Sequence, residues 1–269
     1  MPELPEVETV VRTIAPHLTG RRIVSARFTS RFVTPGNRSA LAARLAGRLV
    51  ERVSRRGKFI VVNLDQGTLA VHLGMTGRLL VGGSEGAHTH GVFILDDGLI
   101  LYDDPRQFGK IEWSAGAPKR VARLGPEPLE ISFEDFRKRL KRSARIKPLL
   151  LNQTFLAGLG NIYVDESLFA AGIHPLATAA MVSASKAGRL HQAIREILTE
   201  AIASGGSSIS DYVDAEGRRG WFQVRHCVYG REGEACVRCG TPIKKIVVGQ
   251  RGTHFCPKCQ RLAKPRAGG

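Results

Sequence analysis

Four of the five cysteines form two pairs of identical spacing near the C-terminal end of the chain. The pairs are Cys236-x-x-Cys239 and Cys256-x-x-Cys259, with sixteen residues between them. Each pair can give two thiolates to one tetrahedral ion, and the length between the pairs suits a β-hairpin. Four thiolates leave no position open for water, so the spacing predicts one structural Zn²⁺ ion. The alternative is four reduced, buried cysteines, and Cys227 is interpreted as a small buried apolar residue.

The cysteine-containing segment carries charge of only one sign. From Cys236 to Gly269 the sequence has eight Lys and Arg residues and no Asp or Glu. A solvated surface usually mixes both signs, so this composition favours a hairpin that faces phosphates. Arg251, in the sequence Gly-Gln-Arg-Gly-Thr, is expected at the hairpin tip, where it can reach into a groove. For any single one of the other basic residues, plain solubility is the alternative.

The N-terminal residues can supply a nucleophile. Methionine before proline is normally trimmed, and removal of Met1 would expose the secondary amine of Pro2. An α-amine titrates near pH 8 and a lysine near 10.4, so the α-amine is far more often uncharged at neutral pH. Its attack on a sugar aldehyde carbon gives an iminium ion that favours elimination at the next carbon. Glu3 and Glu6 lie beside it, one as a candidate general acid, or both as complements of a helix dipole.

The composition points to a folded protein with a polyanionic partner. The chain has 269 residues, of which 43% are hydrophobic, enough for one large domain or two modest ones. Lys and Arg outnumber Asp and Glu by 40 to 24, a net charge of +16. This surplus favours nucleic acid, with an anionic membrane surface as the weaker alternative. The sequence shows no apolar run that could span a bilayer and no signal peptide, so we expect an intracellular protein.

The hydrophobic periodicity divides the chain into a β-rich part and a helical part. A helix is predicted over 5–18, and short strands over 22–114 indicate an antiparallel sandwich or barrel. Ser132 and Asp135 can cap a helix that continues through Leu140. The remaining predictions are a Gly/Pro-rich linker over 115–131, helices over 148–156, 161–171 and 185–204, a mobile loop over 211–222, and strands around the cysteines over 223–261.

Several motifs together resemble one known family. Residues 2–8, Pro-Glu-Leu-Pro-Glu-Val-Glu, are similar to the opening of the bacterial formamidopyrimidine-DNA glycosylases. The resemblance covers essentially the whole chain, with its motifs in the order of the family. The related endonuclease VIII group typically has Gly where Leu4 stands. The further matching motifs are residues 72–77, 104–109, 158–166 and 171–175 and the four-cysteine finger.

The resemblance implies an α+β multidomain fold and a DNA-repair activity. It implies excision of oxidised purines, chiefly 8-oxoguanine and formamidopyrimidines, from double-stranded DNA, and strand cleavage by β- and δ-elimination. We expect a monomer without membrane association, located in the bacterial cytoplasm and bound to the nucleoid through DNA. The expected domains are an N-terminal catalytic β-sandwich with an N-terminal helix over 1–114, an interdomain linker over 115–131, a helix-two-turns-helix domain with a lesion-capping loop over 132–222, and a zinc-finger β-hairpin over 223–269.

The resemblance also assigns catalytic residues. Pro2 matches the Schiff-base nucleophile that attacks C1′, and Glu3 matches the acid that assists opening of the sugar ring. Lys58 matches a lysine near the scissile phosphates that donates a proton in β-elimination, although by sequence alone it would be an exposed strand charge. Arg251 matches the finger arginine that holds the phosphates flanking the lesion and is linked to δ-elimination.

The expected DNA contacts come from several segments. Flipping a nucleotide out of the duplex leaves a gap, and Met75, Arg106 and Phe108 match the residues that fill it. By spacing alone Met75 and Phe108 would be core residues, whereas Leu101 and Tyr102 are better core candidates. Thr76 departs from the Glu or Ser of some relatives, which would alter base contacts. Asn161, His72, Lys147 and His88 are further candidates, with an ordinary helix cap as the alternative for Asn161 and a surface histidine for His88.

Two other functions stay open at this point. A glycosylase specific for oxidised pyrimidines is disfavoured by Leu4 and by the three gap-filling residues. A non-catalytic DNA-binding protein, such as a lesion sensor, would have the same charge and finger. It would not need Pro2, Glu3 and Lys58 together.

Overall fold

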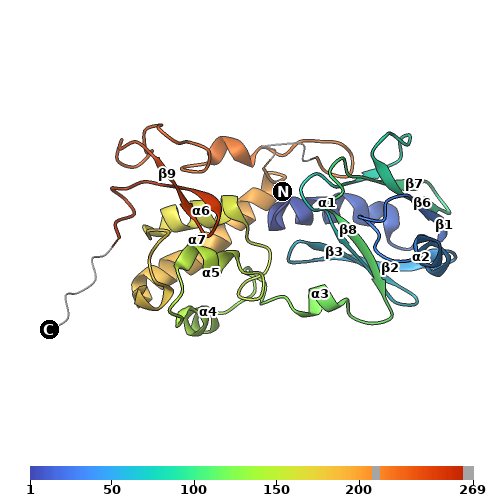
Figure 1. Ribbon diagram of the computed structural model, residues 1–269, viewed down its shortest axis with the longest axis horizontal. Helices are drawn as coiled ribbons and strands as arrows, with labels where there is room; N and C mark the ends of the chain where they lie inside the picture. Colours follow the sequence, from blue (N-terminus) through green and yellow to red (C-terminus); the bar gives the residue numbers. More distant parts are fainter. Residues whose placement is uncertain (208–212, 263–269) are drawn as a thin grey trace. The chain divides into compact units, whose positions relative to one another are not determined.

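The computed structural model describes residues 1–207 and 213–262, which form two compact units. The first unit comprises residues 1–124 and 201–223, and the second comprises residues 125–200 and those from 224 onward (Figure 1). Asp211 and Tyr212, the first residues of the loop predicted over 211–222, lie outside the described residues. Among the described residues, no helix has both the length and the apolar character needed to cross a bilayer.

Two four-stranded antiparallel sheets make up most of the first unit. Their strand orders are β1-β6-β7-β5 and β2-β3-β4-β8. Apolar side chains from both sheets and from helix α1 (Leu4–Leu18) share one core, which confirms the predicted sandwich with an N-terminal helix. The strands are β1 Ile23–Phe28, β2 Val50–Arg56, β3 Phe59–Leu64, β4 Thr68–His72, β5 Arg78–Val81, β6 Thr89–Leu95, β7 Leu99–Asp103 and β8 Lys110–Ser114.

Helix α1 follows the predicted pattern closely. Its N-cap is Glu3, and Pro5 stands in the first turn, where a missing N–H costs no hydrogen bond. Val7, Val10 and Ile14 are buried on one face, as their three- and four-residue spacing requires. The start of this helix therefore has a fixed position against the core.

The described part of the second unit contains the helices α4 to α7 and a two-stranded hairpin. Ser132 caps α4 by accepting a hydrogen bond from the backbone N–H of Asp135 at 3.1 Å, as predicted. Gly172, in the left-handed conformation, ends α6. This helical unit with its finger hairpin confirms the predicted fold class. The elements are α4 Phe133–Leu140, α5 Ile146–Leu151, α6 Asn161–Ala171, α7 Ala184–Ala203, β9 Lys244–Val248 and β10 Arg251–Phe255.

Three short helices differ from the predictions. Helix α2 (Arg38–Leu45) lies in a region predicted as strands, and the side chain of Asn37 caps it. Helix α3 (Lys119–Ala122) lies inside the segment predicted as a linker. The helix predicted over 148–156 is only α5, because the side chains of Asn152 and Gln153 accept the backbone N–H groups of Thr154 and Gly158 (both 2.9 Å) in place of helical partners. Two further 3₁₀ turns are Ala179–Met181 and Phe222–Arg225.

Candidate active site and nucleic-acid interface

The predicted site residues belong to both units. The N-terminal residues, Lys58, the histidines and the predicted gap-filling residues lie in the first unit, and the finger residues with their helical neighbours lie in the second. The contacts that position each of these residues come from the unit to which the residue belongs. The first-unit residues are Pro2, Glu3, Lys58, His72, Met75, His88, Arg106 and Phe108, and the second-unit residues are Lys147, Asn161, Arg251 and the four cysteines.

The N-terminal end of α1 is held by the carboxylate of Glu6. Its Oε2 accepts the backbone N–H of Glu3 at 2.8 Å, and its Oε1 accepts the backbone N–H of Ser207 at 2.7 Å. A Cβ atom at Gly206 would lie 2.9 Å from Oε1, so this close approach requires glycine. Pro2 and Glu3 are both buried. Glu6 therefore positions the backbone of the residues that were predicted to do the chemistry, and the side chain of Glu3 in turn accepts the backbone N–H of Glu6 in a capping box.

Lys58 lies at the tight turn between β2 and β3. Arg56 pairs with Phe59, so Gly57 and Lys58 form the two-residue connection. The side chain of Lys58 is buried, with 6% exposure, which differs from the exposed strand charge that its sequence context alone suggests. A cation held in a largely buried position is suited to meet a developing negative charge.

His72, at the end of β4, lies beside this turn. Its ring centroid is 4.9 Å from that of Phe59 on the neighbouring strand. Burial, followed by the positive charges of Lys58, Arg120 and Lys110, lowers the pKa of His72 to about 4. Its Nδ1 accepts the backbone N–H of Gly74 at 3.1 Å, so the proton of the neutral ring is on Nε2. At neutral pH His72 can therefore donate a hydrogen bond, but it brings no charge to a phosphate.

The three predicted gap-filling residues are exposed on two loops of the first unit. Met75 is 39% exposed and Phe108 is 53% exposed, whereas Leu101 and Tyr102 are buried in β7. The guanidinium carbon of Arg106 lies 4.7 Å from the ring centroid of Phe108. Met75 and Phe108 are thus not core residues. His88 is also exposed, in the segment that precedes β6.

The four paired cysteines form the site for one structural Zn²⁺ ion. Their Sγ atoms all lie within 4.8 Å of one another, with Cys239 and Cys256 at 3.5 Å and Cys236 and Cys259 at 3.9 Å. Tetrahedral thiolates around zinc are about 3.8 Å apart, so the donor set fits the ion. Cys227 lies outside the set, and burial raises the pKa of its thiol.

The finger hairpin presents Arg251 at its tip. Val248 pairs with Arg251, and the connecting residues Gly249 and Gln250 both have positive φ angles, 56° and 61°. Two successive positive φ angles define a type I′ turn, which matches the twist of a hairpin. A Cβ atom at Gly249 would be 3.2 Å from the ring of Pro148, so the tip lies against α5. The side chain of Arg251 is exposed, as a phosphate contact requires.

The structure differs from the prediction that Lys147 contacts a phosphate. Its side chain is 0% exposed, with Nζ 2.6 Å from Oδ1 of Asp165 and 3.2 Å from the carbonyl oxygen of Gly252. A buried ammonium with these partners has no surface to offer to DNA. Because Gly252 follows Arg251, Lys147 instead fixes the strand that carries the exposed arginine.

Asn161 also binds the finger strand. It is the first residue of α6, and its Nδ2 donates to the carbonyl oxygen of Gly252 at 2.9 Å. Oδ2 of Asp165 accepts the backbone N–H of His254 at 2.9 Å. Strand β10 is therefore attached to α6 and α5 at two successive points on either side of Thr253.

Three of the buried acids that the sequence reasoning missed lie within the motifs 104–109 and 158–166. They are Asp104, Asp165 and Glu166, with exposures of 0%, 1% and 4%. Glu166 accepts the backbone N–H groups of Cys227, Val228 and Tyr229 at 2.8–3.0 Å, although burial raises its pKa. The sequence did contain a signal for Asp165 and Glu166, because two adjacent acids within the largely apolar helix 161–171 must be buried with hydrogen-bond partners. Asp104 lay within a recognised motif but carried no predicted role.

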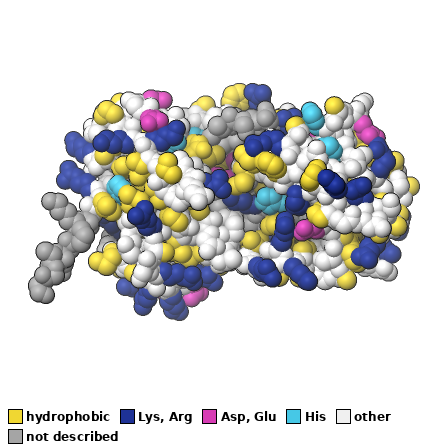
Figure 2. All heavy atoms as spheres, viewed as in Figure 1, with side chains coloured by type: hydrophobic (Ala, Val, Ile, Leu, Met, Phe, Trp, Pro, Cys, Tyr) yellow, Lys and Arg dark blue, Asp and Glu magenta, His cyan; other side chains and the backbone are white. Residues whose placement is uncertain are grey.

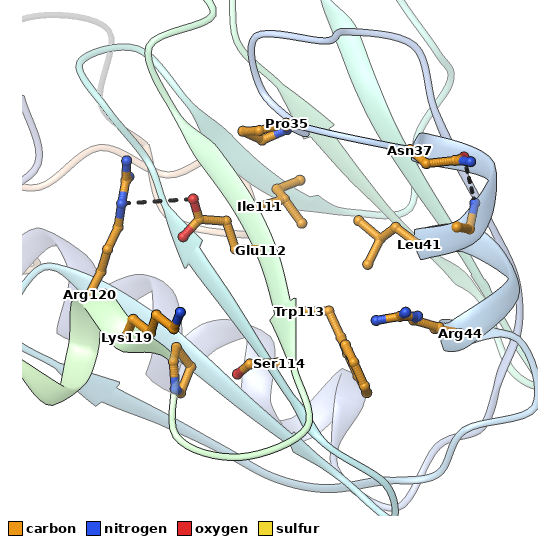
Figure 3. Close-up of a pocket in the computed structure, with 12 residues that line it drawn as sticks. Pro35, Asn37, Leu41, Arg44, Ile111, Glu112, Trp113, Ser114, Lys119 and Arg120 are labelled. Atoms are coloured by element: carbon orange, nitrogen blue, oxygen red, sulfur yellow. Dashed lines mark hydrogen bonds and ion pairs between the residues drawn. The ribbon is translucent and has the colours of Figure 1, made fainter.

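A pocket of about 590 Å³ lies elsewhere in the first unit, between α2 and the edge strand β8 (Figure 3). Arg44 lies over the ring of Trp113 at 4.6 Å, and Arg120 pairs with Glu112 at 3.7 Å. None of the predicted catalytic or DNA-contacting residues lines this pocket. We therefore assign it no part in the reaction.

The basic surplus of the sequence is visible on the molecular surface. In Figure 2, Lys and Arg side chains are spread over the face shown, and Asp and Glu side chains are few. The sequence carries a net charge of +16, and a surface of this charge favours binding to a polyanion.

Comparisons with known proteins agree with this arrangement. Residues 1–111 match the formamidopyrimidine-DNA glycosylase N-terminal domain, residues 124–213 the H2TH domain of the same enzymes, and residues 233–262 a zinc finger found in FPG and IleRS. The formamidopyrimidine-DNA glycosylase of Solibacter usitatus is 60% identical over 264 residues, covering 97% of this chain and 100% of the relative.

Solved structures give the same result. A Lactococcus lactis FPG variant in complex with DNA that contains Fapy-dG has a TM-score of 0.90 and 39% identity, covering 97% of this chain and 100% of that one. The MutM (FPG) protein of Thermus thermophilus has a TM-score of 0.88 and 41% identity, covering 98% and 100%. With its three domains in order and a relative this similar over its full length, the chain belongs to the formamidopyrimidine-DNA glycosylase family.

Proposed function

We propose that this protein is a base-excision-repair DNA glycosylase and abasic-site lyase. It flips out and removes oxidised purines, namely 8-oxoguanine and formamidopyrimidines, from double-stranded DNA. The family assignment supports this proposal, and solved relatives hold DNA that contains Fapy-dG or an abasic site. The observation that carries it is the N-terminal end of α1, where Pro2 and Glu3 are buried and the carboxylate of Glu6 holds their backbone.

The proposed reaction begins at the nitrogen of Pro2, once Met1 has been removed. The nitrogen attacks C1′, the bond from C1′ to the base breaks, and Glu3 gives a proton to the ring oxygen as the sugar opens. The product is an iminium ion between Pro2 and C1′. Loss of a proton from C2′ then expels the 3′ phosphate, and a second elimination expels the 5′ phosphate.

In the proposed reaction, the side chains of Lys58 and Arg251 assist the two eliminations. Lys58, buried at the β2–β3 turn, donates a proton in the first elimination. Arg251, exposed at the tip of the finger hairpin, holds the phosphates on either side of the lesion and assists the second. Lys147 and Asn161 act through Arg251, because both bind the carbonyl oxygen of Gly252.

DNA recognition is assigned to groups of both units. Met75, Phe108 and Arg106 fill the gap that the extruded nucleotide leaves, with Arg106 bonded to the orphaned cytosine. His72 donates a neutral hydrogen bond to a phosphate, the start of α6 at Asn161 faces another, and His88 is a further contact. The protein acts as a monomer in the bacterial cytoplasm, on nucleoid DNA. The catalytic domain is 1–114, followed by the linker 115–131, the helix-two-turns-helix domain 132–222 and the finger 223–269.

The function is tested with three matched duplexes that carry 8-oxoguanine opposite cytosine, thymine glycol, or no lesion. We expect the processed protein to excise 8-oxoguanine and to nick the strand, with far slower reaction on the other two. The variant Glu3→Gln should excise at least a hundredfold more slowly while it still binds the duplex. Glu51→Gln, the same change at an exposed position of β2, should react like the wild type.

Two other results of this experiment would indicate a different function. A preference for thymine glycol would indicate an enzyme for oxidised pyrimidines. Tight binding to 8-oxoguanine DNA with no product after long incubation would indicate a non-catalytic lesion-binding protein.

A further inference from the structure

We propose that the buried Asp104 and the half-buried Thr76 form a hydrogen-bonded pair that holds two loops in one arrangement and so positions the gap-filling residues. The first loop, 74–77, connects β4 to β5 and carries Met75. The second loop, 104–109, connects β7 to β8 and carries Arg106 and Phe108. This inference rests on the proposed function, because it concerns how these exposed side chains are presented to a base pair.

The carboxylate of Asp104 bonds to both loops at once. Its side chain is 0% exposed. Oδ1 accepts the hydroxyl proton of Thr76 from the first loop at 2.6 Å. Oδ2 accepts the backbone N–H of Gly109 at the far end of the second loop at 2.8 Å, and the hydroxyl of Tyr102 at 3.3 Å. One buried group therefore sets the separation of the two loops.

Thr76 and the backbone of Asp104 add three further connections. The Thr76 hydroxyl oxygen accepts the backbone N–H of Arg106 at 3.3 Å. The carbonyl oxygen of Asp104 accepts the N–H of Gln107 at 3.1 Å, and its own N–H donates to the carbonyl of His88 at 3.0 Å. Thr76, which follows Met75, is thus a member of the pair, and Gln107 and Gly109, on either side of Phe108, are both hydrogen-bonded to Asp104.

The backbone of the two loops is closely packed around the pair. A Cβ atom at Gly109 would lie 1.6 Å from the hydroxyl oxygen of Tyr102, and one at Gly74 would lie 2.5 Å from the backbone nitrogen of Gly109. Gln107, beside Phe108, has a φ of 53°, a conformation that residues other than glycine seldom adopt. Its side chain lies 2.5 Å from the hydroxyl of the buried Ser30. The loops are packed backbone against backbone in a conformation that needs these bonds.

The role of the pair follows from this geometry. Met75, Arg106 and Phe108 are exposed, and the contact of Arg106 with the ring of Phe108 lies within a single loop, so the separation of the two loops is set by the backbone that carries these side chains. Insertion into a base stack requires all three to arrive together, and small displacements reduce rates strongly. Asp104 and Thr76 touch neither the sugar nor the base in the proposed reaction. They are positioning residues, and the inward hydrogen bonds of Thr76 replace the base contact that its sequence position suggested.

The test compares Thr76→Val, which keeps the shape and removes the hydroxyl, with Thr76→Ser, which keeps the hydroxyl. Asp104→Asn is the third variant. Two reactions are measured: excision of 8-oxoguanine opposite cytosine in a duplex, and borohydride trapping on a single-stranded abasic oligonucleotide, which has no pair to open. We expect Thr76→Val and Asp104→Asn to slow duplex excision about tenfold or more. Single-stranded trapping should stay within twofold, and Thr76→Ser should behave like the wild type.

Phe108→Ala separates failure of this inference from failure of the proposed function. If Phe108→Ala slows duplex excision and Thr76→Val does not, the positioning role is overturned. It is also overturned if Thr76→Val slows both reactions equally, because that result indicates general damage to the fold. If Phe108→Ala itself reacts like the wild type, the gap-filling assignment in the proposed function fails instead. Should Asp104→Asn not fold, the two Thr76 variants decide the question.

Discussion

Replacing Lys147 by Met should destabilise the second unit rather than remove a contact to DNA. The ammonium group lies 2.6 Å from Asp165, and both side chains are 0% exposed. The substitution leaves the carboxylate of Asp165 in the interior, where its Oδ2 accepts the backbone N–H of His254 at 2.9 Å and lies 3.7 Å from Nδ1 of the same residue. Removing one member of a buried ion pair costs about 3–5 kcal/mol, because the remaining charge stays desolvated. For a chain of this size that corresponds to a Tm lower by about 10 °C.

The double variant Lys147→Met with Asp165→Asn separates the two members of the pair. Asparagine removes the charge that the single variant leaves buried, so part of the lost stability should return. We expect a coupling free energy of about 1–3 kcal/mol between the two positions. Arg78→Met, a change of a partly buried cation in the first unit, serves as a comparison.

Thermal unfolding and DNA binding at several salt concentrations measure the two possible roles of Lys147. A phosphate contact would reduce the slope of log affinity against log salt by about one and leave the Tm nearly unchanged. A change in Tm below about 2 °C with that lower slope would refute the reasoning from burial. A large loss of Tm, partly restored in the double variant, is the expected result.

The other predictions concern the finger and His72. Arg251→Ala should weaken DNA binding and reduce the salt slope by about one, and an unchanged slope would show that Arg251 does not meet phosphate. Chelation of zinc should unfold the β9–β10 hairpin and abolish DNA binding, so full affinity of the metal-free protein would contradict the structural role of the ion. The folded pKa of His72 is about 4 against an unfolded value near 6.5, so the unfolded state binds more protons in that window. The free energy of unfolding should therefore fall as the pH drops from about 6.5 to about 4. The variant His72→Asn should lack the part of this fall that His72 causes. An NMR titration that gives a pKa near 6.5 would contradict the burial of this ring.

The sequence predicted those features that depend on local spacing. The stripe of Val7, Val10 and Ile14 located α1, and the Ser132 cap located α4. The cysteine spacing located the zinc site, because the ligands of a structural zinc are specified by short pairs. In each case neighbouring residues determine the structure with little help from the rest of the chain.

Features that depend on distant contacts could not be predicted in this way. The burial of Lys147 results from Asp165 and Gly252, which are 18 and 105 residues away in the sequence. The role of Asp104 depends on Thr76, 28 residues earlier, and on packing that no periodicity reveals. Helix α2 was missed because it is short and half exposed, so its apolar pattern is weak. The sequence-based predictions did not include the burial of charged side chains such as Lys58, Lys147 and Asp104.

Borohydride trapping followed by peptide mapping identifies the nucleophile of the proposed reaction. The processed protein is incubated with 8-oxoguanine duplex and borohydride, and the cross-linked peptide is sequenced by mass spectrometry. We expect a deoxyribose adduct on the nitrogen of Pro2, at the N-terminus left by removal of Met1, and a lower yield of adduct in Pro2→Gly, whose N-terminus is a primary amine. An adduct on a lysine side chain, or excision and nicking with no trapped adduct at all, would contradict it.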